Sequence, residues 1–291
     1  MLGDPLTIEP LRLTDVDIER LAEEDLRFGD LTTRVLGIGG KPGRMTFTAR
    51  QNLILSGASE AVRLLRRLGV TVSYAGNSGE PFAAGALLLE ATGSAASLHG
   101  GWKIAQTLME WASGVATETN EIVKAARAVA PCIGVFCTRK SVPFTRQLSL
   151  KAILAGGAEI HRLGLSDTVM LFPEHRAFLD TPTDLRPAIA HLKRQVPERS
   201  VMIEVTSEDE AVGAAEALAD VIQLEKFEPA SARRVVNSIR RREDGRPVIA
   251  ASGGITAGNA AAFAAAGVDA LVTSSPFQAR PLDIKVVIEP I

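Results

Sequence analysis

The carboxyl-terminal half of the chain alternates short apolar runs with amphipathic stretches. The runs are continuously apolar, which is typical of strands that a parallel sheet buries on both faces. We expect strands at Cys132–Cys137, Val169–Phe172, Val201–Val205, Val221–Leu224, Val248–Ala251 and Ala270–Thr273, and helices at 208–219, 229–242 and 257–266. Repeated strand–helix units of this length predict an α/β layered or barrel fold. No G-x-G-x-x-G follows the first strand of such a unit, which disfavours a dinucleotide-binding fold.

The first 110 residues follow a different pattern, with Gly- and Pro-containing turns between short segments. We expect helices at 15–25 and 59–68 and β-like segments at 44–49, 53–56, 70–74 and 86–91, with a long helical region at 99–129. We therefore predict an α+β domain over 1–114 and an α/β barrel over 115–281. A last strand-like run, Ile284–Ile288, has no helix after it, and 282–291 is expected to complete the first domain.

Composition narrows the function. The 291 residues suffice for two domains, or for one barrel with an addition. A net charge of −2 and 4% aromatic residues argue against nucleic acid as a partner. No apolar run approaches the roughly 20 residues of a membrane helix, and no leader pattern opens the chain, so we expect a cytoplasmic protein. The spacing of Cys132 and Cys137 fits neither a zinc pair nor a redox motif, which favours core residues.

Six potential cations gather in one short stretch: Arg139, Lys140, Arg146, Lys151, His161 and Arg162. Guanidinium groups match carboxylates and phosphates bidentately, and lysine acts as a compact charge. The cluster suggests a pocket for a multiply charged anion, although a solvated basic helix face is the alternative. His161 either binds the anion or holds a neighbouring side chain.

Polar side chains also follow the predicted barrel strands. Arg139 and Lys140, Glu204, Glu225, Ser252-Gly253-Gly254 and Ser274-Ser275 all stand at or near carboxyl ends of strands, and this face carries the active site of α/β barrels. The Ser-Gly-Gly triplet, expected to open a helix near Thr256, is either a phosphate cradle or an ordinary turn, and the serine pair would complete a phosphate site. The two buried carboxylates need a partner, and we favour Mg²⁺ over a nearby Arg or Lys.

Ordered motifs along nearly the whole chain resemble the quinolinate phosphoribosyltransferase (nicotinate-nucleotide pyrophosphorylase) family. They are Gly29-Asp30-Leu31-Thr32-Thr33, Ser113-Gly114-Val115-Ala116-Thr117, Thr138-Arg139-Lys140, His161-Arg162-Leu163-Gly164-Leu165-Ser166-Asp167 and Ser252-Gly253-Gly254-Ile255. The resemblance implies an amino-terminal sandwich-like domain, an open α/β barrel and a homodimer with a shared active site. It also implies that quinolinate reacts with phosphoribosyl pyrophosphate and Mg²⁺, releasing pyrophosphate and carbon dioxide.

The resemblance assigns roles to single residues. It implies that Thr138, Arg139, His161 and Arg162 bind the substrate, with the last three around its carboxylates and Lys140 close to the pyrophosphate. Glu204 matches a metal-associated acid, and Glu225 stands where the family has Asp. Ser252, Gly253 and Gly254 match the loop that holds the 5-phosphate.

Departures from the family pattern fall in the half of the site that would hold a pyridine dicarboxylate. Trp102-Lys103 replaces a Glu-Arg pair whose Arg reaches the acid from the partner subunit, and Lys103 lacks the bidentate fork. Phe172 replaces an active-site Lys, and Glu225-Lys226 replaces Asp-Asn. This pattern resembles the paralogous ModD branch of pyrophosphorylases, which is associated with molybdate transport.

We therefore predict a Mg²⁺-dependent phosphoribosyltransferase that uses phosphoribosyl pyrophosphate and a heteroaromatic acid. Authentic quinolinate phosphoribosyltransferase activity in NAD biosynthesis is the first alternative. A non-catalytic, anion-binding regulatory barrel is the second. A Schiff-base aldolase is a distant third, because it needs a Lys within a buried strand and the predicted barrel strands contain none.

Overall fold

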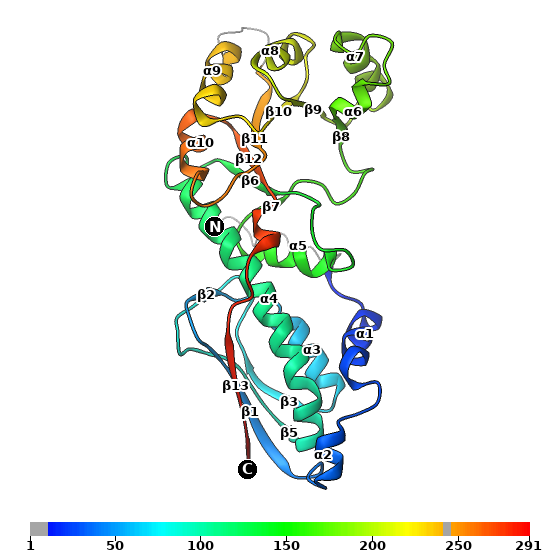
Figure 1. The fold of residues 1–291 in the computed structure, drawn as a ribbon, viewed down its shortest axis with the longest axis vertical. Helices are drawn as coiled ribbons and strands as arrows, with labels where there is room; N and C mark the ends of the chain where they lie inside the picture. The colour runs from blue at the N-terminus through cyan, green and yellow to red at the C-terminus, as the bar shows by residue number, and fades with distance from the viewer. Residues whose placement is uncertain (1–10, 241–245) are drawn as a thin grey trace. The chain divides into compact units, whose positions relative to one another are not determined.

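A computed structural model describes residues 11–240 and 246–291. The chain forms two compact units (Figure 1). The first unit contains the residues up to Asn120, together with Ser141–Gly157 and Pro276–Ile291. The second unit contains Glu121–Lys140 and Ala158–Ser275, so the long helix α4 (Ala95–Arg127) contributes to both.

An antiparallel sheet with the strand order β13-β1-β5-β3 organises the first unit. Its strands are β1 (Pro42–Ala49), β3 (Thr71–Ala75), β5 (Leu87–Ser94) and β13 (Ile284–Pro290), beside a small pair, β2 (Leu53–Ile54) and β4 (Pro81–Phe82). Its helices are α1 (Asp15–Leu26), α2 (Leu31–Val35), α3 (Ala58–Arg67) and α5 (Arg146–Ala155). The alternation along β1 buries Met45 and Phe47 completely, in one core with side chains of α1, α3 and α4.

A seven-stranded parallel sheet organises the second unit, in the order β7-β6-β12-β11-β10-β9-β8. The strands are β6 (Gly134–Cys137), β7 (Glu159–Ile160), β8 (Val169–Leu171), β9 (Val201–Val205), β10 (Val221–Glu225), β11 (Val248–Ser252) and β12 (Ala270–Thr273). Connecting helices are α6 (Pro173–Arg176), α7 (Leu185–Gln195), α8 (Glu208–Glu216), α9 (Pro229–Arg240) and α10 (Ala260–Ala266), and a 3₁₀ turn covers Ser275–Gln278. Since β7 and β8 are its two edges, the sheet forms an open barrel.

The predicted fold class is confirmed: an open α/β barrel accompanies an amino-terminal α+β unit. The predicted bounds of β9 and β12 match the structure, and β13 pairs antiparallel with β1. The predicted end of α9 at residue 242 lies outside the described residues. No helix within the described parts of the chain is both long enough and apolar enough to cross a membrane.

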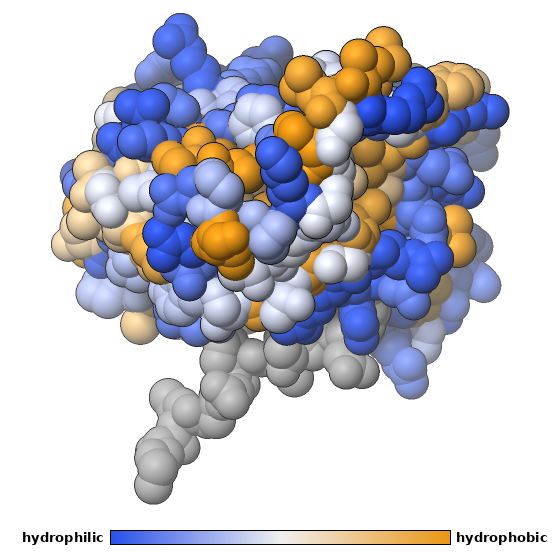
Figure 2. Space-filling view, turned by 90° about the horizontal axis from the view of Figure 1, so that it is seen from below, coloured by the Kyte–Doolittle hydropathy of each residue, from blue (hydrophilic) through white to orange (hydrophobic). Residues whose placement is uncertain are grey.

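Apolar side chains are also exposed on the first unit. Phe28, Leu31, Val35 and Leu36, in and around α2, are between 62% and 86% exposed. Figure 2 shows such hydrophobic patches interspersed with hydrophilic side chains on one face of the molecule. Exposed apolar side chains that gather near one helix are typical of a surface that another protein covers.

Candidate active site

A cavity of about 530 Å³ opens at the carboxyl ends of the barrel strands. Among the residues that line it, four carry positive charge and three carry carboxylates. The lining residues are Thr138, Arg139, Lys140, His161, Arg162, Met170, Phe172, Glu174, Glu204, Gln223, Glu225, Lys226, Ser252, Gly253, Gly254, Val272 and Ser274. This mixture of opposite charges around one cavity is suited to a polyanion that brings its own cation.

Backbone hydrogen bonds beyond the strand ends position the segments that carry Arg139 and Arg162. The N–H of Thr138 donates to the carbonyl of Thr273 at 2.9 Å, and the N–H of His161 donates to the carbonyl of Cys137 at 3.0 Å. These bonds extend the ladder past β12, β6 and β7. The segments that carry Arg139 and Arg162 therefore leave adjacent strands side by side.

His161 is neutral at neutral pH. Burial lowers the pKa of its imidazole to about 4, and the positive charges of Arg162 and Arg139 act in the same direction. Its ring makes an edge contact with Phe136, with ring centroids 6.5 Å apart. Its Nε2 atom is buried and, within the described residues, has no hydrogen-bond partner. The ring is therefore a polar group that a ligand could satisfy.

Arg162 is a buried cation, only 8% exposed. Burial and the nearby charge of Arg139 lower the pKa of its guanidinium. The Nε atoms of both arginines are buried and lack a partner in the part of the chain that the structure describes. Because buried unpaired donors are costly, an anion bound between these side chains would be stabilised by both charge and hydrogen bonds.

Two carboxylates of the cavity come from other strands than the cations: Glu204 is on β9 and Glu225 is on β10. Glu204 accepts a hydrogen bond from Nε2 of Gln223 at 2.9 Å, across paired positions of the two strands. Burial raises the pKa of Glu204, and the negative charges of Glu225 and Glu174 add to this effect. Ser252 Oγ donates to Oε2 of Glu225 at 2.7 Å. The carboxylates repel one another, which favours a bound cation.

The glycine turn after β11 leaves room for a ligand. Gly253 and Gly254 have φ values of +80° and +83°, a region in which other residues are strained. A Cβ on Gly253 would lie 2.8 Å from the backbone nitrogen of Lys226, whereas a Cβ on Gly254 would meet nothing within 4 Å. The side chain of Asn259 holds the loop, since its Oδ1 accepts from Thr256 N–H and its Nδ2 donates to the carbonyl of Gly254.

The prediction that this turn opens a helix was wrong. Helix α10 begins at Ala260, well after Gly254. Since the turn is a separate loop, its backbone N–H groups, rather than a helix terminus, are the groups available to a phosphate.

Most of the predicted site residues line the cavity, but four side chains from the predicted sites and cation cluster do not. Ser275 is outside the lining, and its N–H donates to Thr273 Oγ1. Lys103 is on α4 in the first unit, where its ammonium donates to Gln106 and lies 4.1 Å from the Trp102 ring centroid. Arg146 and Lys151 are on α5, also in the first unit, and they are not among the residues that line the cavity.

Sequence reasoning did not assign Met170, Glu174, Gln223 or Val272 to the cavity, and it treated Phe172 and Lys226 only as departures from the family pattern. One signal was available for Gln223. It precedes Glu225 by two residues on β10, and alternate residues of a strand share a face.

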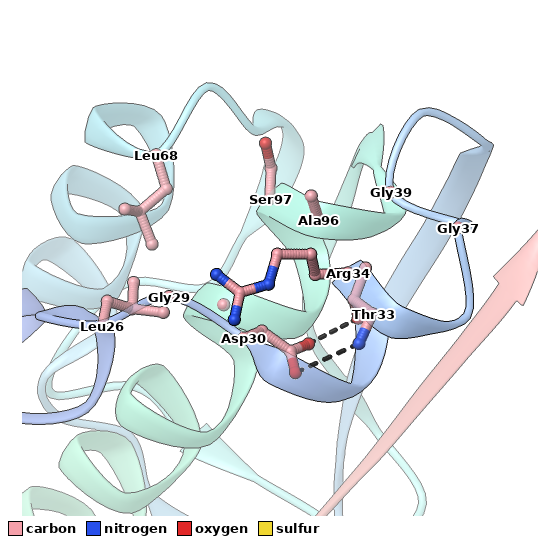
Figure 3. A pocket seen from close by; sticks show the side chains of 11 residues that line it. Leu26, Gly29, Asp30, Thr33, Arg34, Gly37, Gly39, Leu68, Ala96 and Ser97 are labelled. Carbon is pink, nitrogen blue, oxygen red and sulfur yellow. Dashed lines mark hydrogen bonds between the residues drawn. The ribbon is translucent and has the colours of Figure 1, made fainter.

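The Gly29–Thr33 motif shapes a second cavity, of about 560 Å³, in the first unit (Figure 3). Asp30 caps α2 by accepting hydrogen bonds from the N–H groups of Thr32 and Thr33. The hydroxyl of Thr33 also donates to the carboxylate, and this bond, followed by the two backbone bonds, lowers the pKa of Asp30. The Arg34 side chain extends across the cavity, between Asp30 and Ser97 (Figure 3). The structure thus gives this motif a local capping role.

Comparison with known proteins identifies the family. Residues 30–113 match the amino-terminal domain and residues 115–287 the carboxyl-terminal domain of quinolinate phosphoribosyl transferase. The chain is 48% identical to the "Putative pyrophosphorylase ModD" of Rhodobacter capsulatus over 86% of its length and 95% of the relative's. It is 38% identical to the protein of that name from Escherichia coli O157:H7, over 96% of this chain and 98% of that protein. The crystal structure of NadC from Streptococcus pyogenes superposes with a TM-score of 0.86 at 26% identity, covering 99% of this chain and all of that one. The chain belongs to the quinolinate phosphoribosyl transferase family.

Proposed function

We propose that this protein transfers the phosphoribosyl group of phosphoribosyl pyrophosphate to a heteroaromatic acid and releases pyrophosphate. The observation that carries the proposal is the single cavity that Arg139, Lys140, Arg162 and Glu204 share with the Gly253–Gly254 turn. Membership of the family and the similarity to ModD proteins support the same reaction.

The proposed reaction is a displacement at the anomeric carbon of the ribose. A nitrogen lone pair of the acceptor forms the new bond, and the bond to pyrophosphate breaks with its electron pair leaving on the pyrophosphate oxygen. Lys140 and Arg139 stabilise the departing charge, while backbone N–H groups around Gly253 and Gly254 hold the 5-phosphate. His161 and Arg162 hold the carboxylate of the acid. Positioning and electrostatics supply the catalysis, and no protein nucleophile is needed.

Magnesium fits the carboxylates as a metal shared with the substrate. Glu204 and Glu225 line the cavity, and burial together with the negative charge of Glu225 raises the pKa of Glu204. Within residues 11–240 and 246–291, no three His, Cys, Asp or Glu side chains group closely enough to hold a metal by themselves. Since Mg²⁺ commonly uses one or two carboxylates together with substrate phosphates, we expect it to bind with the pyrophosphate and to neutralise its charge.

A second copy of the chain is part of the proposal. The exposed apolar side chains around α2 are the kind of surface that a dimer buries. Lys103 does not line the cavity. We infer that the Lys103 of a second subunit reaches the acid, as the family resemblance implies. The cytoplasmic location and the association with molybdate transport remain predictions.

Lys140→Ala tests the assignment of the cavity. Loss of one well-placed cation commonly lowers the rate by about 10²–10³, so turnover should fall by this factor without loss of folding. Pyrophosphate release with a panel of heteroaromatic acids measures turnover, and calorimetry measures binding of phosphoribosyl pyrophosphate. Lys124→Ala, on the exposed side of α4, is the matched control and should behave like the unmodified protein.

The same measurements separate the alternatives. Turnover of quinolinate would establish the NAD-biosynthetic reaction. Binding of phosphoribosyl pyrophosphate without turnover of any acid would favour a regulatory barrel. Unchanged turnover in Lys140→Ala would refute the role of Lys140, and no binding of phosphoribosyl pyrophosphate would refute the proposed function.

A further inference from the structure

Phe172 places an uncharged aromatic ring in the wall of a strongly charged cavity. It directly follows β8, which is one edge of the parallel sheet. The cavity is otherwise lined largely by cations, carboxylates and small or hydroxyl-bearing residues. The ring is therefore the feature of this cavity that a simple polyanion site does not explain.

Local structure holds the ring in place. Phe172 has an extended backbone and precedes Pro173, the first residue of α6. Its N–H donates to Nδ1 of His175 at 3.1 Å, and the two rings stack with centroids 5.7 Å apart and planes 26° apart. The Phe172 ring therefore packs against the His175 ring of the same turn.

Arg162 lies over the same ring. Its guanidinium carbon is 5.4 Å from the centroid of Phe172, within the range of a cation–π contact. The ring accepts no hydrogen bond from the guanidinium in this contact, so the N–H groups of Arg162 are left for an anion. Among the described residues, Arg162 forms no ion pair with a carboxylate, and its Nε has no partner. These N–H groups can therefore bind a carboxylate of a ligand.

The ring and the cation together define the shape of the ligand. A planar ring can pack on Phe172 at the usual spacing of aromatic pairs. A carboxylate on that ligand ring, directed at Arg162, is paired with the positive charge of the guanidinium. A second carboxylate directed at Phe172 would lose its water and gain no donor, which is unfavourable.

We propose that the acceptor is a planar heteroaromatic acid with a single carboxylate, which binds Arg162 while the ring packs against Phe172. This inference rests on the proposed phosphoribosyl transfer. The ring nitrogen forms a bond to the anomeric carbon as the carbon–oxygen bond to pyrophosphate breaks, and the electron pair leaves with pyrophosphate. The carboxylate stays on the product, so no carbon dioxide is released.

Matched pairs of acids test the inference. Pyridine-3-carboxylate and pyridine-2,3-dicarboxylate differ by one carboxylate, and similar pairs can be made on other heteroaromatic rings. With phosphoribosyl pyrophosphate and Mg²⁺ present, we expect kcat/KM to be at least about tenfold higher for a monocarboxylate than for its dicarboxylate partner. Pyrophosphate release should proceed without carbon dioxide.

Variants of Phe172 test whether its aromatic ring causes the preference for monocarboxylates. Phe172→Leu keeps an apolar side chain without the aromatic face and should raise KM for the monocarboxylate about 3- to 10-fold. Phe172→Tyr keeps the ring and should preserve KM. Phe172→Lys supplies a cation and should reverse the preference toward the dicarboxylate. Phe178→Leu, at a 92% exposed phenylalanine outside the cavity, is the matched control and should change nothing.

The outcomes distinguish this inference from the proposed function. Calorimetry with phosphoribosyl pyrophosphate and a thermal unfolding curve establish that each variant is folded and binds the common substrate. A preference for dicarboxylates, an unchanged preference in all three variants, or failure of every monocarboxylate to bind would overturn the inference while leaving phosphoribosyl transfer intact. Absence of phosphoribosyl pyrophosphate binding in the unmodified protein would overturn both.

Discussion

His161 should titrate far below the usual range of histidine. Burial and the charges of Arg162 and Arg139 lower its pKa from 6.5 to about 4. One pKa unit corresponds to about 1.4 kcal/mol, so the folded protein disfavours the charged imidazole by about 3 kcal/mol. Because the folded pKa is depressed, the stabilising contribution of the neutral ring is present above pH 6.5. It is lost as the pH falls from about 6.5 toward 4.

Two measurements check this expectation. The chain has four histidines, so its ring proton NMR signals can be assigned by comparison with His161→Gln. The His161 signals should shift with a midpoint near pH 4. Urea unfolding at pH 7 and pH 4.5 should show that the unmodified protein loses about 2–3 kcal/mol more stability than His161→Gln over this interval. A midpoint near 6.5, or equal losses in the two proteins, would refute the account of a desolvated ring beside two guanidinium groups.

The cause of the shift can be divided further. Arg162→Gln removes one positive charge and should move the His161 midpoint part of the way back toward 6.5, while burial keeps it below that value. An anion bound between His161 and the arginines should also raise the midpoint. If neither change moves the midpoint, burial alone is responsible and the cations lie too far from the ring to matter.

Three other perturbations give distinct results. Glu204→Gln should raise the urea midpoint at pH 7–8. The pKa of Glu204 is raised in the folded protein, so its charged carboxylate destabilises the fold as the pH rises. The difference in midpoint between the variant and the unmodified protein should vanish near pH 4. Gly253→Ala should cost about 1–3 kcal/mol and weaken binding of phosphoribosyl pyrophosphate in calorimetry, since a Cβ at positive φ would crowd Lys226. Lys151→Met should cost about 3 kcal/mol, because it leaves the buried Glu60 without its cation, yet calorimetry should show unchanged binding of phosphoribosyl pyrophosphate. If Lys151→Met is instead stable and binds phosphoribosyl pyrophosphate more weakly, the prediction that Lys151 belongs to the anion-binding cluster would be supported.

The barrel could be predicted from the sequence because its strands are buried on both faces. The apolar runs Val201–Val205 and Ala270–Thr273 correspond to β9 and β12 residue for residue. Parallel strands also place all their carboxyl ends on one side of a sheet, so polar residues at those ends are predicted to converge without knowledge of the strand order. Glu204, Glu225 and Ser252 meet at the cavity for this reason.

Proximity in sequence was misleading where the chain crosses between units. The residues up to Lys140 belong to the second unit, Ser141–Gly157 to the first, and the chain from Ala158 to the second again. Helix α5 lies in the inserted part, so Arg146 and Lys151 belong to a different unit from the cations on either side of them in the sequence. Strand β7, with only two residues, is too short to show a hydrophobic period, and nothing local revealed that the chain re-enters the sheet there.

The two halves of the cavity differ in how strongly the fold constrains them. The glycine turn follows β11, which pairs with β10, and the N–H of Lys226 donates to the carbonyl of Ser252 just beyond that pairing. Arg162 and Phe172 instead follow β7 and β8, the two unpaired edges of the sheet, and meet through side chains alone. A substitution in the turn therefore disturbs a hydrogen-bonded ladder, whereas a substitution at Phe172 changes the wall of the cavity and leaves every strand pairing in place. Since the sheet does not close at this point, acceptor recognition can diverge there while the phosphate-binding half is kept.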